Sequence, residues 1–250
     1  MKRTNRMVLL LMFAGMLIGA CSKQPPRKED EPSVGTSTKI EGDSMLYGLA
    51  CEGCTDSVLV FLPGTGGDPV TFDIIDATLQ HKVIGRPKTG DWTAVVLNRE
   101  NRKKADMVIN LDELKGQWVS LVAPTLRHAP TALVDGEEEQ AEFDSLLQER
   151  LKPIEMGFAL KRHYVAQPIG TVRAMSTRED DPVVFPQPRR YMEWHVYNGL
   201  LVLKVRPTHE DSLKNRLNVC DTAEFLMLTR DSLRLRFKDG DKGYYRKSEK

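Results

Sequence analysis

Short apolar segments separated by turn-forming residues run through the first half of the chain. They lie at residues 44–50, 57–63, 70–76, 92–98 and 106–111, with Gly, Pro, Asn and Asp between them. The segments are rich in β-branched and aromatic side chains, and none keeps the period of a helix, so the pattern predicts β-strands. Five short strands within residues 39–112 favour a small closed barrel, because closure removes exposed strand edges.

The second half of the chain contains the one segment with a clear helical pattern. Acidic residues open this segment near residues 137–151, where a helix N-terminus favours negative charge. Phe143, Leu146, Leu147 and Leu151 share one face, and Pro153 ends the segment. The sequence therefore predicts an amphipathic helix inserted into a β-rich region.

Further strands are predicted on both sides of this helix, within residues 113–250. The apolar segments lie at residues 114–124, 157–166, 170–175, 191–205, 223–229, 232–237 and 242–247. Asn198-Gly199 stands between two apolar runs, which is the strongest short signal for a β-hairpin. We therefore expect an all-β chain with two small barrels, one over residues 39–112 and one over residues 113–250.

Two resemblances refine this expectation. The strand count of residues 39–112 resembles an OB-type barrel. "KGQW", with Gly116 and Trp118, resembles the G-x-W opening of lipocalin-type barrels. "NGLLVLKV", "MLTRDSLRLRF" and "GYYRK" resemble later strands of the lipocalin-like domains in exported Bacteroidetes lipoproteins. In that superfamily a basic side chain often covers the opening Trp at the barrel base. The resemblance implies that Arg246 covers Trp118, a cation–π contact that stabilises by ~0.5–2 kcal/mol.

The first twenty residues have the pattern of an export signal. Basic residues precede an apolar stretch at residues 7–18, which is too short to span a bilayer as a stable helix. The stretch ends in "LIGAC", and Cys21 supplies a thiol that can take up a lipid. This resembles the lipobox of bacterial lipoproteins, which are cleaved before the cysteine and acylated on it. An ordinary secretory signal with a coincidental cysteine is the alternative.

Residues 21–38 are rich in Pro, Ser and charge, and they cannot bury enough apolar surface to fold. We expect them to form a flexible tether between a lipid anchor and the barrels. Ser22 follows Cys21, which in enterobacterial lipoproteins favours sorting to the outer membrane. The expected location is therefore the cell envelope, at the outer membrane, with the periplasmic or surface face left open.

Charge and motif content narrow the function further. The chain has 36 Lys and Arg against 35 Asp and Glu, and removing the three signal-peptide bases leaves 33 against 35, a balance of −2. This balance does not favour a nucleic-acid partner. The chain lacks a G-x-S-x-G or HExxH motif, and its histidines are scattered, so we expect no enzyme and no cofactor. Glu193 and His195 share a strand face and are interpreted as a surface ion pair, with Trp194 turned to the core.

Cys51 and Cys54 form a CxxC motif flanked by strands. A redox CxxC needs a helix N-terminus to lower the thiol pKa, and Glu52 adds an unfavourable negative charge here. We therefore predict a disulfide that closes a hairpin turn, with a gain on the order of 2 kcal/mol. Copper(I) accepts two thiolates, so a metal site at the same pair is the alternative. Cys220 is predicted to be a free thiol and a small buried hydrophobe.

The predicted function is non-enzymatic. We expect a lipid-anchored envelope protein that binds a small apolar ligand, a lipid or a protein partner at the outer membrane. An envelope stress or copper sensor is the alternative, because the chain resembles in its parts the copper-homeostasis and adhesion-sensing outer-membrane lipoprotein of enterobacteria. A thiol–disulfide redox protein is a further alternative.

Overall fold

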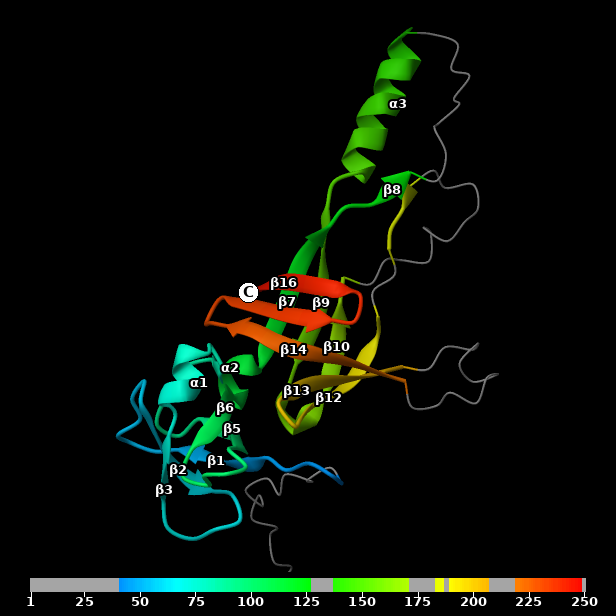
Figure 1. Ribbon diagram of the computed structural model, residues 1–250. Coiled ribbons are helices and arrows are strands. Elements are labelled where there is room, and N and C mark those ends of the chain that lie inside the picture. Colours follow the sequence, from blue (N-terminus) through cyan, green and yellow to red (C-terminus); the bar gives the residue numbers. More distant parts are fainter. Residues whose placement is uncertain (1–40, 127–136, 171–182, 187–188, 207–218, 249–250) are drawn as a thin grey trace, which may run out of the picture. The chain divides into compact units, whose positions relative to one another are not determined.

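The protein is described here by a computed structural model that covers residues 41–126, 137–170, 183–186, 189–206 and 219–248 (Figure 1). The predicted signal segment, the whole predicted tether with Cys21, and all but the first residue of the strand predicted over 170–175 lie outside these residues. The described residues are mainly β-strands with a few helices, which confirms the all-β prediction. No described helix is long and apolar enough to cross a membrane.

The first barrel is a six-stranded sheet with the order β3-β2-β1-β5-β6-β4. Its strands are β1 (Leu46–Ala50), β2 (Val58–Pro63), β3 (Val70–Asp73), β4 (Val83–Ile84), β5 (Trp92–Leu97) and β6 (Ala105–Asn110). Strands β1 to β3 form an antiparallel meander, and β1 also pairs with β5. A parallel bridge between Asp73 and Lys104 brings the end of β3 to the start of β6. The sheet is thus a nearly closed, OB-like barrel, as predicted.

A short helix, α1 (Ile75–Leu79), follows β3 inside the segment that was predicted as one strand over residues 70–76. That prediction is wrong beyond Asp73. The Asp73 carboxylate accepts a hydrogen bond from the Ile75 amide at 3.0 Å, which turns the chain out of the strand. Buried Ala77 then packs α1 on the barrel, whereas Ile75 and Leu79 are exposed.

The second barrel is an eight-stranded antiparallel sheet with the order β10-β9-β7-β16-β15-β14-β13-β12. Its strands are β7 (Gly116–Val122), β9 (Ile154–Leu160), β10 (Ala166–Ile169), β12 (Tyr191–Tyr197), β13 (Leu200–Val205), β14 (Cys220–Leu228), β15 (Ser232–Phe237) and β16 (Gly240–Arg246). The first and last strands pair at Trp118 and Arg246, and a Val165–Glu193 bridge spans the remaining seam. This up-and-down order is that of a lipocalin-like barrel.

Local signals account for several of these elements. Asn198 and Gly199 form the predicted β12–β13 turn, and both have positive φ. The segment predicted as one strand over residues 157–166 is two strands, because the short helix η1 (Arg162–Tyr164) interrupts it. Helix α3 (Glu137–Arg150) matches the predicted helix, with Leu146 exposed. Strands β8 (Thr125–Leu126) and β11 (Val183–Val184) pair in a small separate sheet.

The two barrels are joined by α2 (Leu111–Leu114), a single helical turn. The Asn110 side chain caps α2 by accepting hydrogen bonds from the Asp112 and Glu113 amides, both at 3.0 Å. The expected boundary between residues 112 and 113 falls inside this helix. Residues Ser37–Lys250 form one compact unit.

One hydrophobic core contains residues from both barrels. Met45, Ile84, Ala94, Ile109, Leu111 and Leu114 of the first half pack in the same cluster as Trp118, Trp194, Leu201, Leu233 and Leu235 of the second. A second core lies within the first barrel and includes Leu59, Phe61 and Phe72. Each barrel therefore depends on the other for part of its buried surface.

The start of β1 is also hydrogen-bonded to the β12–β13 hairpin. The Tyr47 hydroxyl lies 2.6 Å from Asp43 Oδ2 and 2.8 Å from the Val196 carbonyl. Asp43 is buried, and its Oδ1 accepts hydrogen bonds from the Met45 and Asn198 amides. A buried carboxylate is costly unless hydrogen-bonded, so this network stabilises the contact between the two barrels.

We expect Tyr47→Phe to lower the free energy of unfolding by about 1–3 kcal/mol, because it removes a donor from a buried carboxylate. Urea unfolding followed by tryptophan fluorescence measures the change. Tyr245→Phe is the matched control, since its hydroxyl donates to Glu155 at 2.8 Å at an exposed site, and it should have little effect. Equal effects of the two substitutions would contradict this account of the Asp43–Tyr47 network.

Candidate ligand-binding site

The interior of the lipocalin-like barrel is filled by side chains. Trp118, Trp194, Leu201, Leu203, Leu233 and Leu235 are each at most 1% exposed. A hollow of about 140 Å³ remains at the level of Ser120 and Met156, two residues further along β7 from Trp118. This hollow is smaller than the usual small-molecule pocket, which encloses roughly 300–1,000 Å³.

Aromatic side chains form the walls of that small hollow. Phe158 contacts Tyr191 and Tyr244 edge to face, with ring centroids 5.6 and 5.1 Å apart. The Tyr191 hydroxyl donates to Asp221 Oδ2 at 2.9 Å, and Arg189 pairs with the other oxygen of the same carboxylate at 3.0 Å. Burial raises the pKa of Tyr191 and of Tyr244, so both hydroxyls stay protonated at neutral pH.

The structure brings together Trp118 and Arg246, the pair named in the sequence analysis. The guanidinium carbon of Arg246 lies 4.2 Å from the centroid of the Trp118 ring. Arg246 also donates hydrogen bonds to the Lys115, Glu113 and Arg230 carbonyls, and the Trp118 indole donates to the Leu114 carbonyl at 2.8 Å. This end of the barrel is thereby sealed and held to α2.

The G-x-W pattern has a steric reason here. Gly116 has a φ of +146°, and a Cβ atom at this position would lie 2.0 Å from Nη1 of Arg246. A larger residue would therefore displace the guanidinium from the Trp118 ring. Gly116 and Trp118 together make the space that Arg246 fills.

We expect Arg246→Met to lower the free energy of unfolding by about 2–4 kcal/mol. The substitution removes the cation–π contact and leaves the partly buried carbonyls of Glu113 and Lys115 without this donor. Arg236→Met is the control, because Arg236 is exposed and pairs with exposed Asp241. Thermal unfolding of both variants tests the expectation, and an Arg246 variant as stable as the control variant would refute it.

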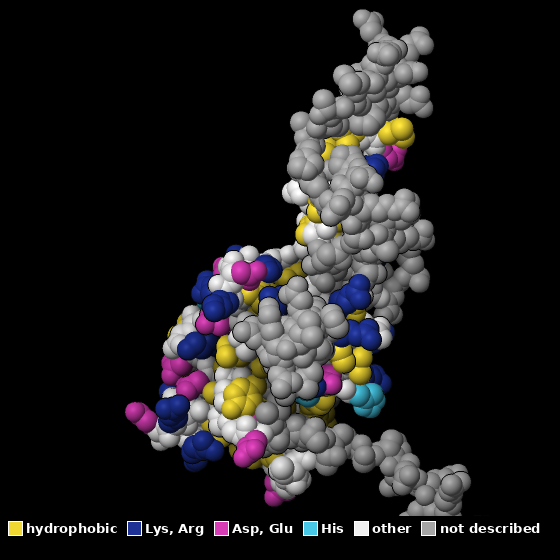
Figure 2. All heavy atoms as spheres, turned by 90° about the vertical axis from the view of Figure 1, so that its right-hand side faces the viewer, with side chains coloured by type: hydrophobic (Ala, Val, Ile, Leu, Met, Phe, Trp, Pro, Cys, Tyr) yellow, Lys and Arg dark blue, Asp and Glu magenta, His cyan; other side chains and the backbone are white. Residues whose placement is uncertain are grey.

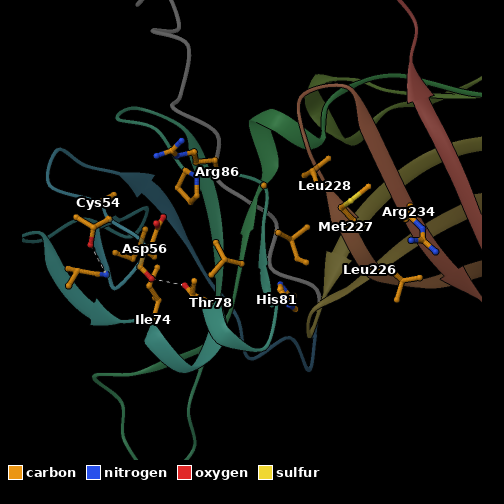
Figure 3. A pocket seen from close by; sticks show the side chains of 17 residues that line it. Cys54, Asp56, Ile74, Thr78, His81, Arg86, Leu226, Met227, Leu228 and Arg234 are labelled. Carbon is orange, nitrogen blue, oxygen red and sulfur yellow. Dashed lines mark hydrogen bonds between the residues drawn. The ribbon is translucent and has the colours of Figure 1, made fainter.

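A partly apolar pocket of about 490 Å³ lies between the two barrels (Figure 3). We call it the inter-barrel pocket. From the first barrel it is lined by Cys54, Thr55, Asp56, Val58, Leu59, Ile74, Thr78, His81, Val83, Ile84, Gly85, Arg86 and Pro87, and from the second by Leu226, Met227, Leu228 and Arg234. Leu59, Ile74, Ile84 and Leu228 are buried and form its apolar floor.

A bulge in β14 provides the wall from the second barrel. The register with β15 shifts between Phe225 and Met227, so Leu226 is an extra residue in β14. Phe225 and Leu228 remain buried, whereas Met227 is 37% exposed on the pocket side. Because of the bulge, the apolar side chain of Met227 lies on the outer face of the barrel, where a regular strand would carry a polar side chain.

The wall from the first barrel is held by α1, β4 and the turn after β4. The Thr78 hydroxyl donates to the Asp56 carbonyl at 2.7 Å, which fixes α1 to the β1–β2 turn. The Arg86 amide donates to Glu113 Oε2 at 2.6 Å, and the Arg86 carbonyl accepts from Asn110 Nδ2 at 3.0 Å. The backbone that carries Arg86 is therefore fixed on both sides.

Gly85 permits the close approach of the two barrels at this pocket. Its φ is +76°, and a Cβ atom there would lie 3.2 Å from Leu228 Cδ2 and 3.0 Å from Asn110 Cβ. A side chain at Gly85 would strain the backbone and push β14 away from β4. The shape of the pocket thus depends on this glycine.

The predicted disulfide between Cys51 and Cys54 is absent from the structure, in which both residues are free thiols. The Cys54 thiol lies 3.1 Å from the Cys51 carbonyl and 3.4 Å from the Val60 carbonyl, so it is hydrogen-bonded to the backbone. Hydrogen bonds within the chain, rather than a covalent link, hold this turn. The described residues also contain no group of three or more His, Cys, Asp or Glu that could hold a metal ion.

Two further sequence interpretations are wrong. Cys220 is a free thiol but exposed, because it is the first residue of β14. Glu193 pairs with Lys204 at 3.3 Å across the β12–β13 ladder, whereas the His195 ring stacks on Tyr164 at 4.7 Å. Trp194 is buried as predicted, and burial lowers the pKa of His195 despite the opposing effect of Glu193.

Sequence reasoning missed the inter-barrel pocket. Its lining residues come from positions 54–59, 74–87 and 226–234, and no motif relates these segments. The run Leu226-Met227-Leu228 was a local signal for an apolar patch outside the barrel. Successive side chains of a strand point to opposite faces of the sheet, so three consecutive apolar residues cannot all face the barrel interior.

Comparisons with known proteins were made on the whole chain. No protein-family model matches it, and no curated protein matches it. The crystal structure of a lipocalin-like protein from Bacteroides thetaiotaomicron aligns with a TM-score of 0.28 and 18% identity, over 54% of this chain and 97% of that one. The lipocalin-like assignment of the second barrel rests on its strand order and its closure.

Proposed function

We propose that the protein is a lipid-anchored envelope protein that binds a small, largely apolar ligand in the inter-barrel pocket. The observation that carries the proposal is the contrast between the two cavities. The barrel interior is filled, whereas the inter-barrel pocket has an apolar floor and a volume of about 490 Å³. A sizeable apolar pocket with a few polar groups is the default binding site of a protein.

The construction of the pocket supports binding rather than simple imperfect packing. Its walls are fixed by the β14 bulge, by Gly85 and by the hydrogen bonds to the Arg86 backbone. A preformed site loses little conformational entropy when a ligand binds. On the face of the molecule seen in Figure 2, basic and acidic side chains are interspersed, with apolar side chains between them.

The anchor is the second part of the proposal and rests on the sequence. "LIGAC" supplies the cleavage pattern and Cys21 the acylated thiol, and residues 21–38 supply the tether. A single acyl chain gives only marginal membrane binding, whereas several chains on one cysteine hold a protein stably. The protein would then present its pocket close to the membrane surface, at the outer membrane.

We expect the mature wild-type protein to partition into the detergent phase of a Triton X-114 extraction and to incorporate labelled palmitate. Cys21→Ala should abolish both properties, because it removes the acylated thiol. Cys220→Ala is the control, since it removes an exposed thiol without affecting the anchor. Recovery of wild-type protein in the aqueous phase without label would refute the lipoprotein proposal.

The pocket itself is tested with Nile red, a neutral apolar dye whose fluorescence rises in apolar surroundings. We expect the wild type to bind the dye and Met227→Trp to weaken binding by at least about tenfold, because the larger side chain fills the pocket. Met192→Trp is the matched control. Met192 is 41% exposed on β12 and does not line the pocket, so its replacement should change little. Binding that is equally strong in both variants would exclude this pocket as the site.

A further inference from the structure

We infer that the ligand of the inter-barrel pocket is an amphiphile with one anionic headgroup, which is bound at an edge of the pocket by one of its two arginines, Arg86 or Arg234. This inference rests on the proposed function and adds the chemical class of the ligand. It follows from the charges that line the pocket, from their exposure and from the apolar floor between them.

The charged side chains at the pocket are mostly basic. Arg86 and Arg234 stand against Asp56, and with His81 neutral the pocket has a formal charge of +1. This is a local excess, because the chain as a whole is close to neutral. A ligand with a single negative charge would balance it.

Both arginines are able to meet a ligand. Figure 3 shows Arg86 and Arg234 on opposite walls, one from the turn after β4 and the other from β15. Among the described residues, neither guanidinium has a salt bridge. Asp241 is the acidic residue near Arg234, but it is hydrogen-bonded to Arg236. That hydrogen bond is the main cause of the lowered pKa of Asp241, and the charge of Arg234 contributes least.

The backbone holds each arginine in position. Arg86 lies between Gly85 and Pro87, and its amide and carbonyl are both hydrogen-bonded. Arg234 is paired with Met227 in the ladder and with Gly243 on the other side, where no side chain competes for space. A guanidinium so placed can donate two hydrogen bonds to a carboxylate or to a phosphate.

The floor of the pocket suits the rest of such a ligand. Leu59, Ile74, Ile84 and Leu228 are buried, and partly buried Val58 and Val83 border them. Burial of an alkyl chain is favourable on these side chains, whereas an anionic group would be costly there. The apolar part is therefore expected on the floor and the headgroup at the edge, where water and an arginine both reach it.

The test compares a fluorescent acid with its neutral ester. The probes are 11-(dansylamino)undecanoic acid, its methyl ester, and the corresponding dansylated undecyl phosphate, titrated against the full mature chain. We expect the acid to bind on the order of tenfold more tightly than the ester, since charged hydrogen bonds are the stronger ones. The phosphate arm shows whether the site prefers a carboxylate or a phosphate, and either preference supports an anionic headgroup.

Variants assign the preference to the two arginines. In Arg86→Gln/Arg234→Gln the ratio of ester to acid dissociation constants should fall to within about twofold of one, because no arginine is left at either edge to bind the headgroup. Arg86→Lys/Arg234→Lys keeps the charge and should keep most of the preference. Arg99→Gln/Arg102→Gln makes the same charge change on an exposed loop away from the pocket and should leave the ratio unchanged. Circular dichroism confirms that each variant is folded.

The outcomes separate this inference from the proposed function. Equal affinities for acid and ester in the wild type, or a preference that survives in Arg86→Gln/Arg234→Gln, would overturn the inference while Nile red binding still supports the pocket. Acid binding that is insensitive to Met227→Trp would place the anion elsewhere and also overturn it. Failure of Nile red, acid and ester alike to bind would overturn both.

Discussion

The single turn of α2 is the constraint on which both barrels and the pocket depend. The carbonyls of Glu113 and Lys115 accept hydrogen bonds from Arg246, which closes the base of the second barrel. On the other side, Asp112 accepts from the Trp92 amide and Glu113 from the Arg86 amide, both at 2.6 Å. The position of β16 and the position of the turn that carries Arg86 are therefore both fixed by hydrogen bonds to α2 and its C-cap residue. A change at the barrel base would therefore be felt at the pocket.

Large side chains fill the described interior of this lipocalin-like barrel. Trp118 and Trp194 are both fully buried, and each indole donates to a backbone carbonyl, Trp118 to Leu114 and Trp194 to Lys161. A ligand in the interior would have to displace large side chains and break these bonds, at a cost of several kcal/mol. Binding in the inter-barrel pocket requires no such rearrangement. In the proposed site, the barrel would form one wall of the pocket and would not enclose the ligand.

The elements that could be predicted from the sequence are those specified by nearby residues. The alternation of Leu233, Leu235 and Phe237 identifies β15, and Asn198-Gly199 identifies a hairpin, because both signals depend only on local geometry. Helix α1 was missed because "VTFDIID" is rich in β-branched residues, while the deciding interaction is one side-chain hydrogen bond of Asp73. The Trp118–Arg246 contact was predicted through resemblance to a known family. No local pattern relates the two residues, because 127 residues lie between them in the sequence.

The candidate site could not be predicted, because it exists only once the two barrels are packed together. Arg86 and Arg234 look like any other surface arginines in the sequence, and their common setting depends on the β14 bulge and on Gly85. The same holds for the pairing of Glu193, which was assigned to His195 on its own strand but goes to Lys204 on the neighbouring one. Cross-strand register decides such pairs, and register is set by the whole sheet.

The residues just before β1 take part in the packing of the two barrels. Asp43 and Ser44 are hydrogen-bonded to Asn198 of the second barrel, and the chain then enters β1 of the first barrel, so residues 43–47 contact both barrels. Because the walls of the inter-barrel pocket come from the two barrels, the same packing that orders residues 43–47 also keeps the pocket in shape.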